Sequence, residues 1–362
     1  MSMPWLDTIS YDLSLSENPF PPLPSVRDAV EDCMLRANRY PEFLPRQLPG
    51  LIAGHLGVRA DQVVVGSGAT GVAMQIMQTL PAPGSPFVYA APTFDGYPIM
   101  AGMIGLRPAP VPLDASGRQD LWAMVRAVDE RTGLVAVCRP HNPTGTVVPA
   151  SELKAFLCAI PPRVPVILDE AYVEFLSAAA TLDTVELVHR HPNVLVLRTF
   201  SKAYGLAGLR IGYAFGSPEL VARVHRLQLP FGVPAGAVAA VAASYAARAE
   251  LGERILRITT EREILRTALR RSGIRVPRSS ANFLYLPGRD IGAALARAGI
   301  LAKRYPDGSA RIAVGDAAAG RAVLRALGAR SAPNVHPLRR DDSRASALTV
   351  RSEPSVVRAP HR

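Results

Sequence analysis

The sequence predicts an α/β fold in which a mainly parallel β-sheet is accompanied by a second, smaller α+β domain. Up to about residue 250, short apolar segments alternate with patterns typical of amphipathic helices. These segments are rich in Val, Ile and Leu without strict alternation, which is typical of parallel strands covered by helices on both faces. After residue 250, one long helical pattern is followed by short strand-like and helical segments, which indicates a separate α+β region.

Six segments of the first region are expected to form buried strands, with three helices between them. The strands are expected at QVVVG (62–66), PFVYAAP (86–92), LVAVC (134–138), PVILDE (165–170), NVLVLRTF (193–200) and LRIGYAFG (209–216). The helices are expected at 70–80, 120–128 and 151–160. Ser151 is a candidate N-cap for the last helix, and Pro81 and Pro161 would end the first and the last.

The second region begins with a long amphipathic helix over 251–271, which Gly273 would end. Further elements are expected at NFLYL (282–286), 291–298, ILAKRY (300–305), ARIAVG (310–315) and 317–327. We predict a large domain of residues 41–250 and a small domain that combines 1–40 with 251–330. Residues 331–362 have no periodicity and are rich in Ser, Pro and Arg, so they are predicted to form a disordered tail.

The composition excludes several classes of protein. Hydrophobic residues make up 48% and charged residues 20% of the chain, so it is neither wholly disordered nor fibrous. No stretch reaches the roughly 18 uncharged apolar residues of a membrane-spanning helix, and MSMPWLDTIS at the start lacks the features of a signal peptide. Cys33, Cys138 and Cys158 are far apart. We therefore expect a cytoplasmic protein with no disulfide framework and no metal site.

The net charge of +11 does not by itself indicate a nucleic-acid partner. The tail contributes +3, and the remainder is spread over Arg-rich helices. The tail has no aromatic residue and no dense run of Lys and Arg, which a basic arm that binds nucleic acid would be expected to have. We expect neither a nucleic acid nor a membrane as a partner.

Polar segments follow four of the predicted strands. GSGATG (66–71) opens a helix directly after a strand, and NPTG (142–145) follows the third strand. DEAY (169–172) and TFSK (199–202) end the next two strands. Each segment alone is typical of an ordinary turn or a solvated charge. Because the carboxyl ends of parallel strands share one edge of a sheet, all four are expected to meet in a ligand-binding crevice.

Together these segments supply what pyridoxal phosphate requires. A lysine can form a Schiff base with its aldehyde, and a carboxylate can keep its ring nitrogen protonated. An amide and a tyrosine hydroxyl can donate hydrogen bonds to its phenolate oxygen. The phosphate dianion needs a helix N-terminus, hydroxyl groups and an Arg. Phe94 in PTFDGYP follows another strand and can stack on the ring.

Five segments within residues 10–330 are more specific. They are SENPFPPLPSVRDAV (16–30), RYPEF (39–43), HNPTGTVV (141–148), VILDEAYVEF (166–175) and LRTFSKAYGLAGLRIGYAFG (197–216). In these segments the chain resembles the fold-type I pyridoxal-phosphate-dependent aminotransferases, in particular the histidinol-phosphate aminotransferase group and its actinobacterial aromatic (phenylalanine) branch. The resemblance implies a large domain with a mixed, mostly parallel sheet of the seven-stranded type and a smaller α+β domain.

The resemblance also implies roles for individual residues. Lys202 would form the Schiff base and then move the proton between the substrate Cα and C4′ of the cofactor. Asp169 would hold the pyridinium N–H, and Asn142 and Tyr172 would hydrogen-bond the phenolate oxygen. The residues expected to bind the phosphate are Ser201, Arg210, the main-chain N–H groups of Ala69 and Thr70, and Thr199.

Three further residues are implied at the edges of the site. Tyr40 would reach the phosphate bound by a second copy of the chain, which requires a homodimer with shared active sites. Arg311 would bind the α-carboxylate of the substrate. Lys303 stands where histidinol-phosphate enzymes have an Arg for the substrate phosphate, and a lysine cannot make the planar two-bond contact of a guanidinium.

We therefore predict pyridoxal-phosphate-dependent transamination between an aromatic amino acid, such as phenylalanine, and a 2-oxo acid, with 2-oxoglutarate chosen by analogy. Phe20, Leu23 and Phe231 are expected to form the apolar wall for the substrate. The alternatives are a histidinol-phosphate aminotransferase, a lyase or decarboxylase that uses the same residues, and a non-enzymatic cofactor-binding regulator. The sequence assigns no role to His141 or to the tail.

Overall fold

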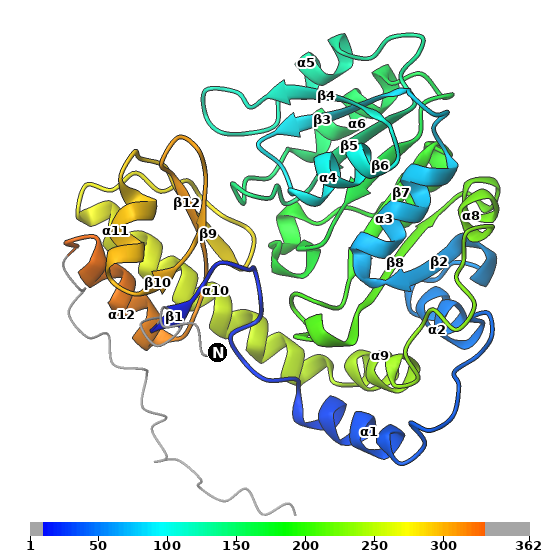
Figure 1. Cartoon of the computed structure of the whole chain (residues 1–362), viewed down its shortest axis with the longest axis horizontal. Helices are drawn as coiled ribbons and strands as arrows, with labels where there is room; N and C mark the ends of the chain where they lie inside the picture. The colour runs from blue at the N-terminus through cyan, green and yellow to red at the C-terminus, as the bar shows by residue number, and fades with distance from the viewer. Residues whose placement is uncertain (1–9, 330–362) are drawn as a thin grey trace, which may run out of the picture. The chain divides into compact units, whose positions relative to one another are not determined.

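The computed structural model describes residues 10–329 of the 362-residue chain, which lie within one compact unit (Figure 1). Its central sheet has seven strands in the order β2-β8-β7-β6-β5-β3-β4. Neighbours from β4 to β7 are parallel, whereas β8 is antiparallel to both β7 and β2. The strands are β2 (Val63–Ser67), β3 (Pro86–Ala91), β4 (Arg107–Pro112), β5 (Leu134–Cys138), β6 (Val166–Asp169), β7 (Val194–Thr199) and β8 (Ile211–Gly216). The predicted fold class is confirmed.

The six strands expected in this region are present, with ends shifted by no more than two residues, but β4 was not expected. Its sequence is RPAPVP, and the prolines concealed it, because Pro cannot donate to a ladder. An edge strand tolerates such residues, and β4 lies at the edge of the sheet beside β3.

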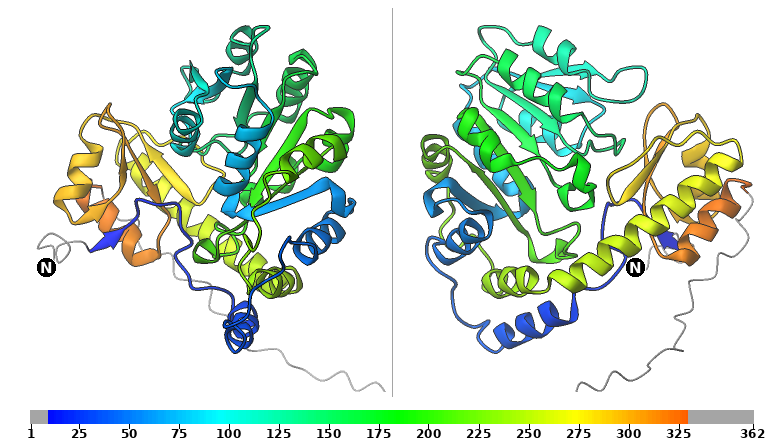
Figure 2. Two further views of the ribbon diagram at one scale, coloured as in Figure 1. Left: turned by 45° about the vertical axis from the view of Figure 1, so that its right-hand side comes forward. Right: turned by 180° about the vertical axis from the view of Figure 1, so that it is seen from behind.

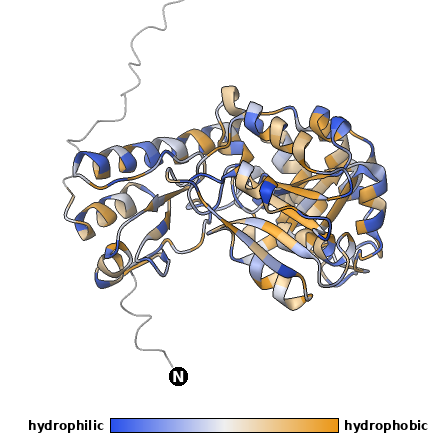
Figure 3. Ribbon diagram, turned by 90° about the horizontal axis from the view of Figure 1, so that it is seen from above, coloured by the Kyte–Doolittle hydropathy of each residue, from blue (hydrophilic) through white to orange (hydrophobic). Residues whose placement is uncertain are grey.

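Helices cover both faces of the sheet, and alternate strand residues enter two separate apolar cores. Val63 and Val65 of β2 belong to one core, and Val64 between them belongs to the other. Figure 3 shows these apolar strands enclosed by the surrounding helices. The helices are α2 (Gln47–Leu56), α3 (Gly68–Thr79), α4 (Gly96–Met103), α5 (Leu121–Arg126), α6 (Ala150–Ala159), α7 (Thr184–Arg190), α8 (Pro218–His225) and α9 (Ala237–Ala246). We call residues 47–246 the large lobe.

One predicted cap was wrong. Pro149 is the N-cap of α6, and Ser151 lies inside the helix without a capping hydrogen bond. The helix therefore begins at Ala150, one residue earlier than expected. Short 3₁₀ turns also occur, at η2 (Ala60–Gln62), η3 (Val173–Phe175), η4 (Ala178–Ala180) and η5 (Ala207–Leu209).

The small lobe, residues 248–326, has its own apolar core. The long helix α10 (Arg248–Arg271) leads from α9 into this lobe (Figure 2). The remaining elements are β9 (Phe283–Leu286), α11 (Ile291–Arg297), β10 (Ile300–Leu301), β11 (Lys303–Arg304), β12 (Ala310–Ala313) and α12 (Ala317–Ala326). The segment expected as one strand at 300–305 is divided, because β10 pairs with one sheet and β11 with another.

The N-terminal segment contacts both lobes. β1 (Tyr11–Asp12) pairs with β10 of the small lobe, whereas α1 (Pro24–Met34) packs against α9 of the large lobe. The predicted domain boundaries stay a prediction, and the predicted disordered tail lies outside the described residues.

Candidate active site

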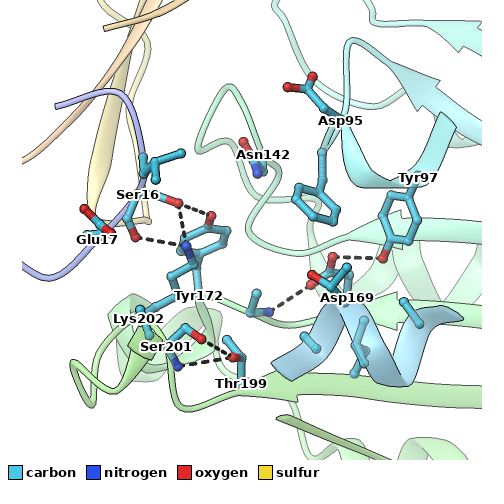
Figure 4. A pocket seen from close by; sticks show the side chains of 18 of the residues that line it. Ser16, Glu17, Asp95, Tyr97, Asn142, Asp169, Tyr172, Thr199, Ser201 and Lys202 are labelled. Atoms are coloured by element: carbon cyan, nitrogen blue, oxygen red, sulfur yellow. Dashed lines mark hydrogen bonds between the residues drawn. The ribbon is translucent and has the colours of Figure 1, made fainter. Parts of the chain in front are cut away.

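A cavity of about 470 Å³ lies at the edge where the parallel strands end (Figure 4). β2, β6 and β7 end at this edge, and the antiparallel β8 begins there. Strand direction therefore brings Asp169, at the end of β6, together with Lys202 and Arg210, which come from two separate turns. The residues predicted for the site all line this cavity except Tyr40, namely Ala69, Thr70, Phe94, Asn142, Asp169, Tyr172, Thr199, Ser201, Lys202, Arg210, Lys303 and Arg311.

Lys202 extends from the turn after β7 toward the N-terminal segment. Its Nζ donates to the Ser16 carbonyl oxygen at 3.0 Å and to Ser16 Oγ at 2.7 Å. The Asn18 side chain donates to the carbonyl oxygens of Lys202 and Ala203, which holds the turn. Burial, together with the charge of Arg311, lowers the pKa of Lys202 to about 8. A larger fraction of this side chain is therefore the neutral, nucleophilic amine at neutral pH.

Asp169 is a buried carboxylate at the end of β6. Its Oδ2 accepts from the Tyr97 hydroxyl at 2.9 Å, and its Oδ1 accepts from the main-chain N–H of Ala171 at 3.0 Å. Burial raises the pKa of Asp169, and these hydrogen bonds act in the opposite direction. A cation beside this carboxylate would favour its charged form further.

Tyr172 and Ser16 form a polar pair next to Lys202. Ser16 Oγ lies 2.7 Å from the Tyr172 hydroxyl oxygen, and Lys202 Nζ lies 5.6 Å from the centre of the Tyr172 ring. Burial raises the pKa of Tyr172 to about 12, so its hydroxyl stays protonated and can donate a hydrogen bond at neutral pH.

The start of α3 is suited to bind an anion. A helix N-terminus leaves main-chain N–H groups unpaired, and here these belong to the turn that contains Ala69 and Thr70. Arg210 lies next to this turn, and its Nη2 donates to the Ser67 carbonyl oxygen at 3.4 Å. Gly68 has φ +71°, and a Cβ there would collide with the Arg210 guanidinium. The turn thus combines free donors with a cation.

Thr199 and Ser201 line the same cavity as this turn. The Thr199 hydroxyl donates to Ser201 Oγ at 3.0 Å and accepts from the Ser201 main-chain N–H at 3.1 Å. Thr199 therefore orients Ser201, while its own hydroxyl is already engaged.

Arg311 lies on β12 and is almost fully buried. Its Nη1 donates to Asn142 Oδ1 at 2.8 Å and its Nη2 to the Ser14 carbonyl oxygen at 2.8 Å. Its Nε has no hydrogen-bond partner among residues 10–329. Since Asn142 accepts from Arg311 through its oxygen, its amide N–H groups remain available as donors.

A family model named "Aminotransferase class I and II" matches residues 8–326. This chain is a class I and II aminotransferase.

Several bacterial relatives of this aminotransferase are named aromatic amino acid aminotransferases. An aromatic amino acid aminotransferase of Cutibacterium acnes is 43% identical over 316 residues, which are 86% of this chain and 90% of that protein. One of Rhodococcus opacus is 44% identical over 330 residues, 89% of this chain and 92% of that protein. The predicted resemblance is confirmed.

The solved structures include a histidinol-phosphate aminotransferase of Sinorhizobium meliloti in complex with pyridoxal-5′-phosphate. It is 30% identical to this aminotransferase, covers 88% of this chain and 90% of that chain, and superimposes with a TM-score of 0.82. The fold class is thereby confirmed a second time.

Class I and II aminotransferases depend on pyridoxal phosphate, and the cavity of this aminotransferase fits that cofactor. Lys202 offers a partly neutral amine, and Asp169 is a buried carboxylate that can accept from a protonated ring nitrogen. The α3 turn, Ser201 and Arg210 lie together where a phosphate could bind. The residues needed for each part of the cofactor are therefore present in one cavity.

Some predicted residues lie elsewhere in this aminotransferase. Tyr40 is 84% exposed and lines a separate cavity. The expected apolar wall is not in the described cavity. Leu23 is buried in a core that it shares with the large lobe, Phe231 packs against Tyr40 at a tilt, and Phe20 packs under Arg257. These three residues were predicted because their side chains are apolar. Tertiary packing, which the local sequence does not report, places them outside the cavity.

Sequence reasoning missed several residues of the aminotransferase site. Ser16, Asp95, Tyr97 and Tyr305 line the cavity, and none had been given a role. A signal existed for Tyr97, because it lies in the same short segment after a strand, PTFDGYP (92–98), from which Phe94 was chosen. Ser16 lies 186 residues from Lys202 in the chain, so only the folded structure brings them together.

His141, whose role was left open, is fully buried and does not line the cavity. Its Nδ1 lies 2.9 Å from Thr144 Oγ1, and burial lowers its pKa to about 3. A neutral His141 therefore supports the turn that carries Asn142. No helix within residues 10–329 is long and apolar enough to cross a membrane.

Proposed function

We propose that this aminotransferase transfers the amino group of an aromatic amino acid, phenylalanine in the first place, to a dicarboxylic 2-oxo acid such as 2-oxoglutarate. The relatives named aromatic amino acid aminotransferases support the donor class, since they are 40–44% identical over most of this chain. The observation that carries the choice is Lys303. It is a single ammonium, already paired with Asp95, whereas a substrate phosphate favours a planar guanidinium.

When bound, pyridoxal phosphate supplies the carbonyl that receives the amino group and a ring that accepts the electrons released at Cα. Arg311 orients the substrate by binding its α-carboxylate in the polar pocket that Asn142 completes. Lys202 Nζ removes the Cα proton, for which its lowered pKa of about 8 is suited. Asp169 keeps the ring nitrogen protonated, and Tyr97 holds Asp169 in position.

The remaining predicted roles belong to the same proposal. Asn142 and Tyr172 donate to the phenolate oxygen of the cofactor, and Phe94 stacks on its ring. The phosphate is bound by Ser201, Arg210 and the N–H groups of Ala69 and Thr70, with Thr199 orienting Ser201.

We also propose a homodimer, because an exposed aromatic cluster surrounds Tyr40. The Tyr40 and Phe231 rings lie 4.8 Å apart and the Phe43 and Phe231 rings 5.2 Å apart. All three are at least 42% exposed, and exposed apolar patches of this kind are typical of protein interfaces. In the dimer, Tyr40 would reach the phosphate in the second copy.

A cytoplasmic location is part of the proposal. Its support is the state of Cys33, Cys138 and Cys158, which are all free, as is usual for proteins of a reducing compartment.

A half-reaction screen tests the substrate class. The cofactor-loaded protein is mixed with one amino donor at a time, and the visible absorbance of the lysine-bound cofactor is followed as it disappears. We expect kcat/KM for phenylalanine to exceed that for histidinol phosphate by at least about tenfold, or about 1.4 kcal/mol. A preference for histidinol phosphate that is lost in Lys303→Ala would establish the second candidate, which the 30% identical solved structure favours. Release of CO₂ without an oxo acid would establish a decarboxylase.

A further inference from the structure

An ion pair crosses the cavity from one lobe to the other. Lys303 Nζ, on β11 of the small lobe, pairs with Asp95 Oδ2 of the large lobe, and both residues line the cavity. Among the ion pairs within residues 10–329, this one joins the large lobe to the small lobe. The side chains of Lys303 and Asp95 are 37% and 51% exposed. The ion pair is therefore solvated, and separating the two charges costs little free energy.

Asp95 is not used for the local role that its position suggests. It is the N-cap of α4, yet its side chain makes no capping hydrogen bond, although Asp is among the preferred capping residues. Its carboxylate points away from Tyr97 (Figure 4) and pairs with Lys303 instead. The Asp95 carboxylate therefore contributes an ion pair with Lys303 rather than a helix cap.

The position of Lys303 relative to Arg311 suits two carboxylates in one ligand. β11 and β12 are antiparallel, and Lys303 is directly opposite Arg311 in their register. Directly opposed residues project from the same face, with Cβ atoms about 5 Å apart. A dicarboxylate can therefore place one carboxylate on Arg311 and the other on Lys303.

The uncharged aromatic side chain of the proposed donor requires a different environment in this part of the cavity, where Lys303 lies. A free ammonium beside the aromatic ring of the donor would lose part of its hydration and gain in return only a weak cation–π contact. When Asp95 neutralises Lys303, this part of the cavity presents an ion pair and the Tyr305 ring, whose centre lies 5.9 Å from Lys303 Nζ. Asp95 thus decides whether a ligand in the cavity meets a free Lys303 ammonium or a neutralised ion pair.

We propose that Asp95 is a specificity-determining residue that competes with the ligand for Lys303. It pairs with Lys303 while the aromatic donor occupies the cavity. It yields Lys303 to the distal carboxylate of the dicarboxylic acceptor in the second half-reaction, and its own carboxylate then returns to water. This inference rests on the proposed function, because it assigns the two substrates of that reaction to two states of one ion pair.

Binding of two unreactive ligands to the cofactor-loaded protein tests the proposal. Glutarate is a dicarboxylate and 3-phenylpropionate an aromatic monocarboxylate, and neither has an amino or oxo group. In Asp95→Asn, calorimetry should find the dissociation constant for glutarate at least about fivefold lower and that for 3-phenylpropionate unchanged or higher. Asp95→Glu keeps the charge and should retain the wild-type preference.

Two comparisons separate this role from a general structural effect. Asp61→Asn removes a similarly exposed carboxylate, paired with Arg59 outside the cavity, and should leave both dissociation constants unchanged. Adding Lys303→Met to Asp95→Asn should abolish the gain in glutarate affinity. The proposal is overturned if the preference of Asp95→Asn stays within twofold of wild type, or if the gain persists without Lys303.

The proposed function can fail independently of this inference. If the wild type converts no aromatic amino acid but the glutarate preference still depends on Asp95 and Lys303, the donor assignment is wrong and the ion-pair competition stands. If phenylalanine is converted and the preference does not depend on Asp95, the inference alone is wrong.

Discussion

Asp169 combines burial with hydrogen bonds that favour its charged form. Burial raises its pKa, while the Ala171 N–H and the Tyr97 hydroxyl donate to its two oxygens. The charge of Lys202 acts in the same direction as these donors. Such a carboxylate is poised to bind a further cation, and a protonated ring nitrogen is the cation that the proposed cofactor provides.

Asp169→Asn should slow transamination by at least about a hundredfold, which corresponds to about 2.7 kcal/mol in the barrier. An amide cannot keep the ring nitrogen protonated, so electrons released at Cα lose their acceptor. Steady-state kinetics with phenylalanine measures the effect. Thermal unfolding of the cofactor-free protein is the control and should show only a small loss of stability. The change removes a buried charge, but it leaves one of the Ala171 and Tyr97 donors without its acceptor. Activity within fivefold of wild type would contradict the role of Asp169.

The lowered pKa of Lys202 predicts how the rate of cofactor binding depends on pH. Its pKa is lowered from 10.5 to about 8, and only the neutral amine attacks an aldehyde. The rate at which cofactor-free protein binds pyridoxal phosphate should therefore rise with pH and level off above a midpoint near 8. At pH 7 the neutral fraction is about 300-fold larger than for a lysine of ordinary pKa.

Stopped-flow absorbance over pH 6.5 to 9.5 measures this rate. Lys202→Ala is the matched control and should give no lysine-bound absorbance at any pH. A rate that keeps rising to pH 9.5 without levelling would mean that Lys202 has an ordinary pKa.

At the scale of elements, strands that are buried on both faces were predictable because their composition follows from their surroundings. β5 was predicted to the residue, since LVAVC is apolar throughout. β4 was not, because its prolines carry the signal of a loop and only its edge position permits them. The division at Ala302 between β10 and β11 also depends on partners far away in the chain, which local sequence does not report.

The position of the turn proposed to bind the cofactor phosphate depends on the contact between β8 and α3. Gly212 of β8 faces this turn so closely that a Cβ would lie 2.8 Å from Ala69 Cα. Because backbone atoms cannot move aside as a flexible side chain can, a larger residue here must push α3 away from β8.

Gly212→Ala should therefore destabilise the protein by about 1–3 kcal/mol and weaken retention of the cofactor. Chemical denaturation measures the first effect and gel filtration of the loaded protein the second. Gly54→Ala is the matched control, because Gly54 lies in the exposed part of α2 with nothing within 4 Å of its Cβ position. That change should stabilise the helix by up to about 1 kcal/mol. If both variants behaved alike, the close contact would not matter.

At the scale of the whole molecule, the sequence predicted most of the residues that meet in the cavity but not all of their neighbours. The motifs at strand ends pointed to Lys202, Asp169 and Asn142, because strand direction places such ends together. Ser16 and Asp95 could not be found this way. Their contacts join segments that are distant in the chain, Ser16 with Lys202 and Asp95 with Lys303, and no local pattern records such a meeting.

Tyr40 carries the prediction that involves two molecules. It is 84% exposed and outside the cavity of its own chain, so its proposed contact with a phosphate requires a second copy. Tyr40→Phe removes one hydrogen bond to a charged group and should weaken cofactor binding by about tenfold. Lys202→Ala alone should be inactive.

Mixing the two variants distinguishes a shared site from a separate one. In a dimer of one Tyr40→Phe chain and one Lys202→Ala chain, one site carries both changes and the other carries neither. After equal mixing and re-equilibration, about a quarter of all sites should be fully wild type, and activity at limiting cofactor should rise above the average of the two pure variants. If Tyr40 acted within its own chain, every site would keep one defect and mixing would bring no gain. The same null result with a monomer in light scattering would place the exposed aromatic cluster outside any interface between copies.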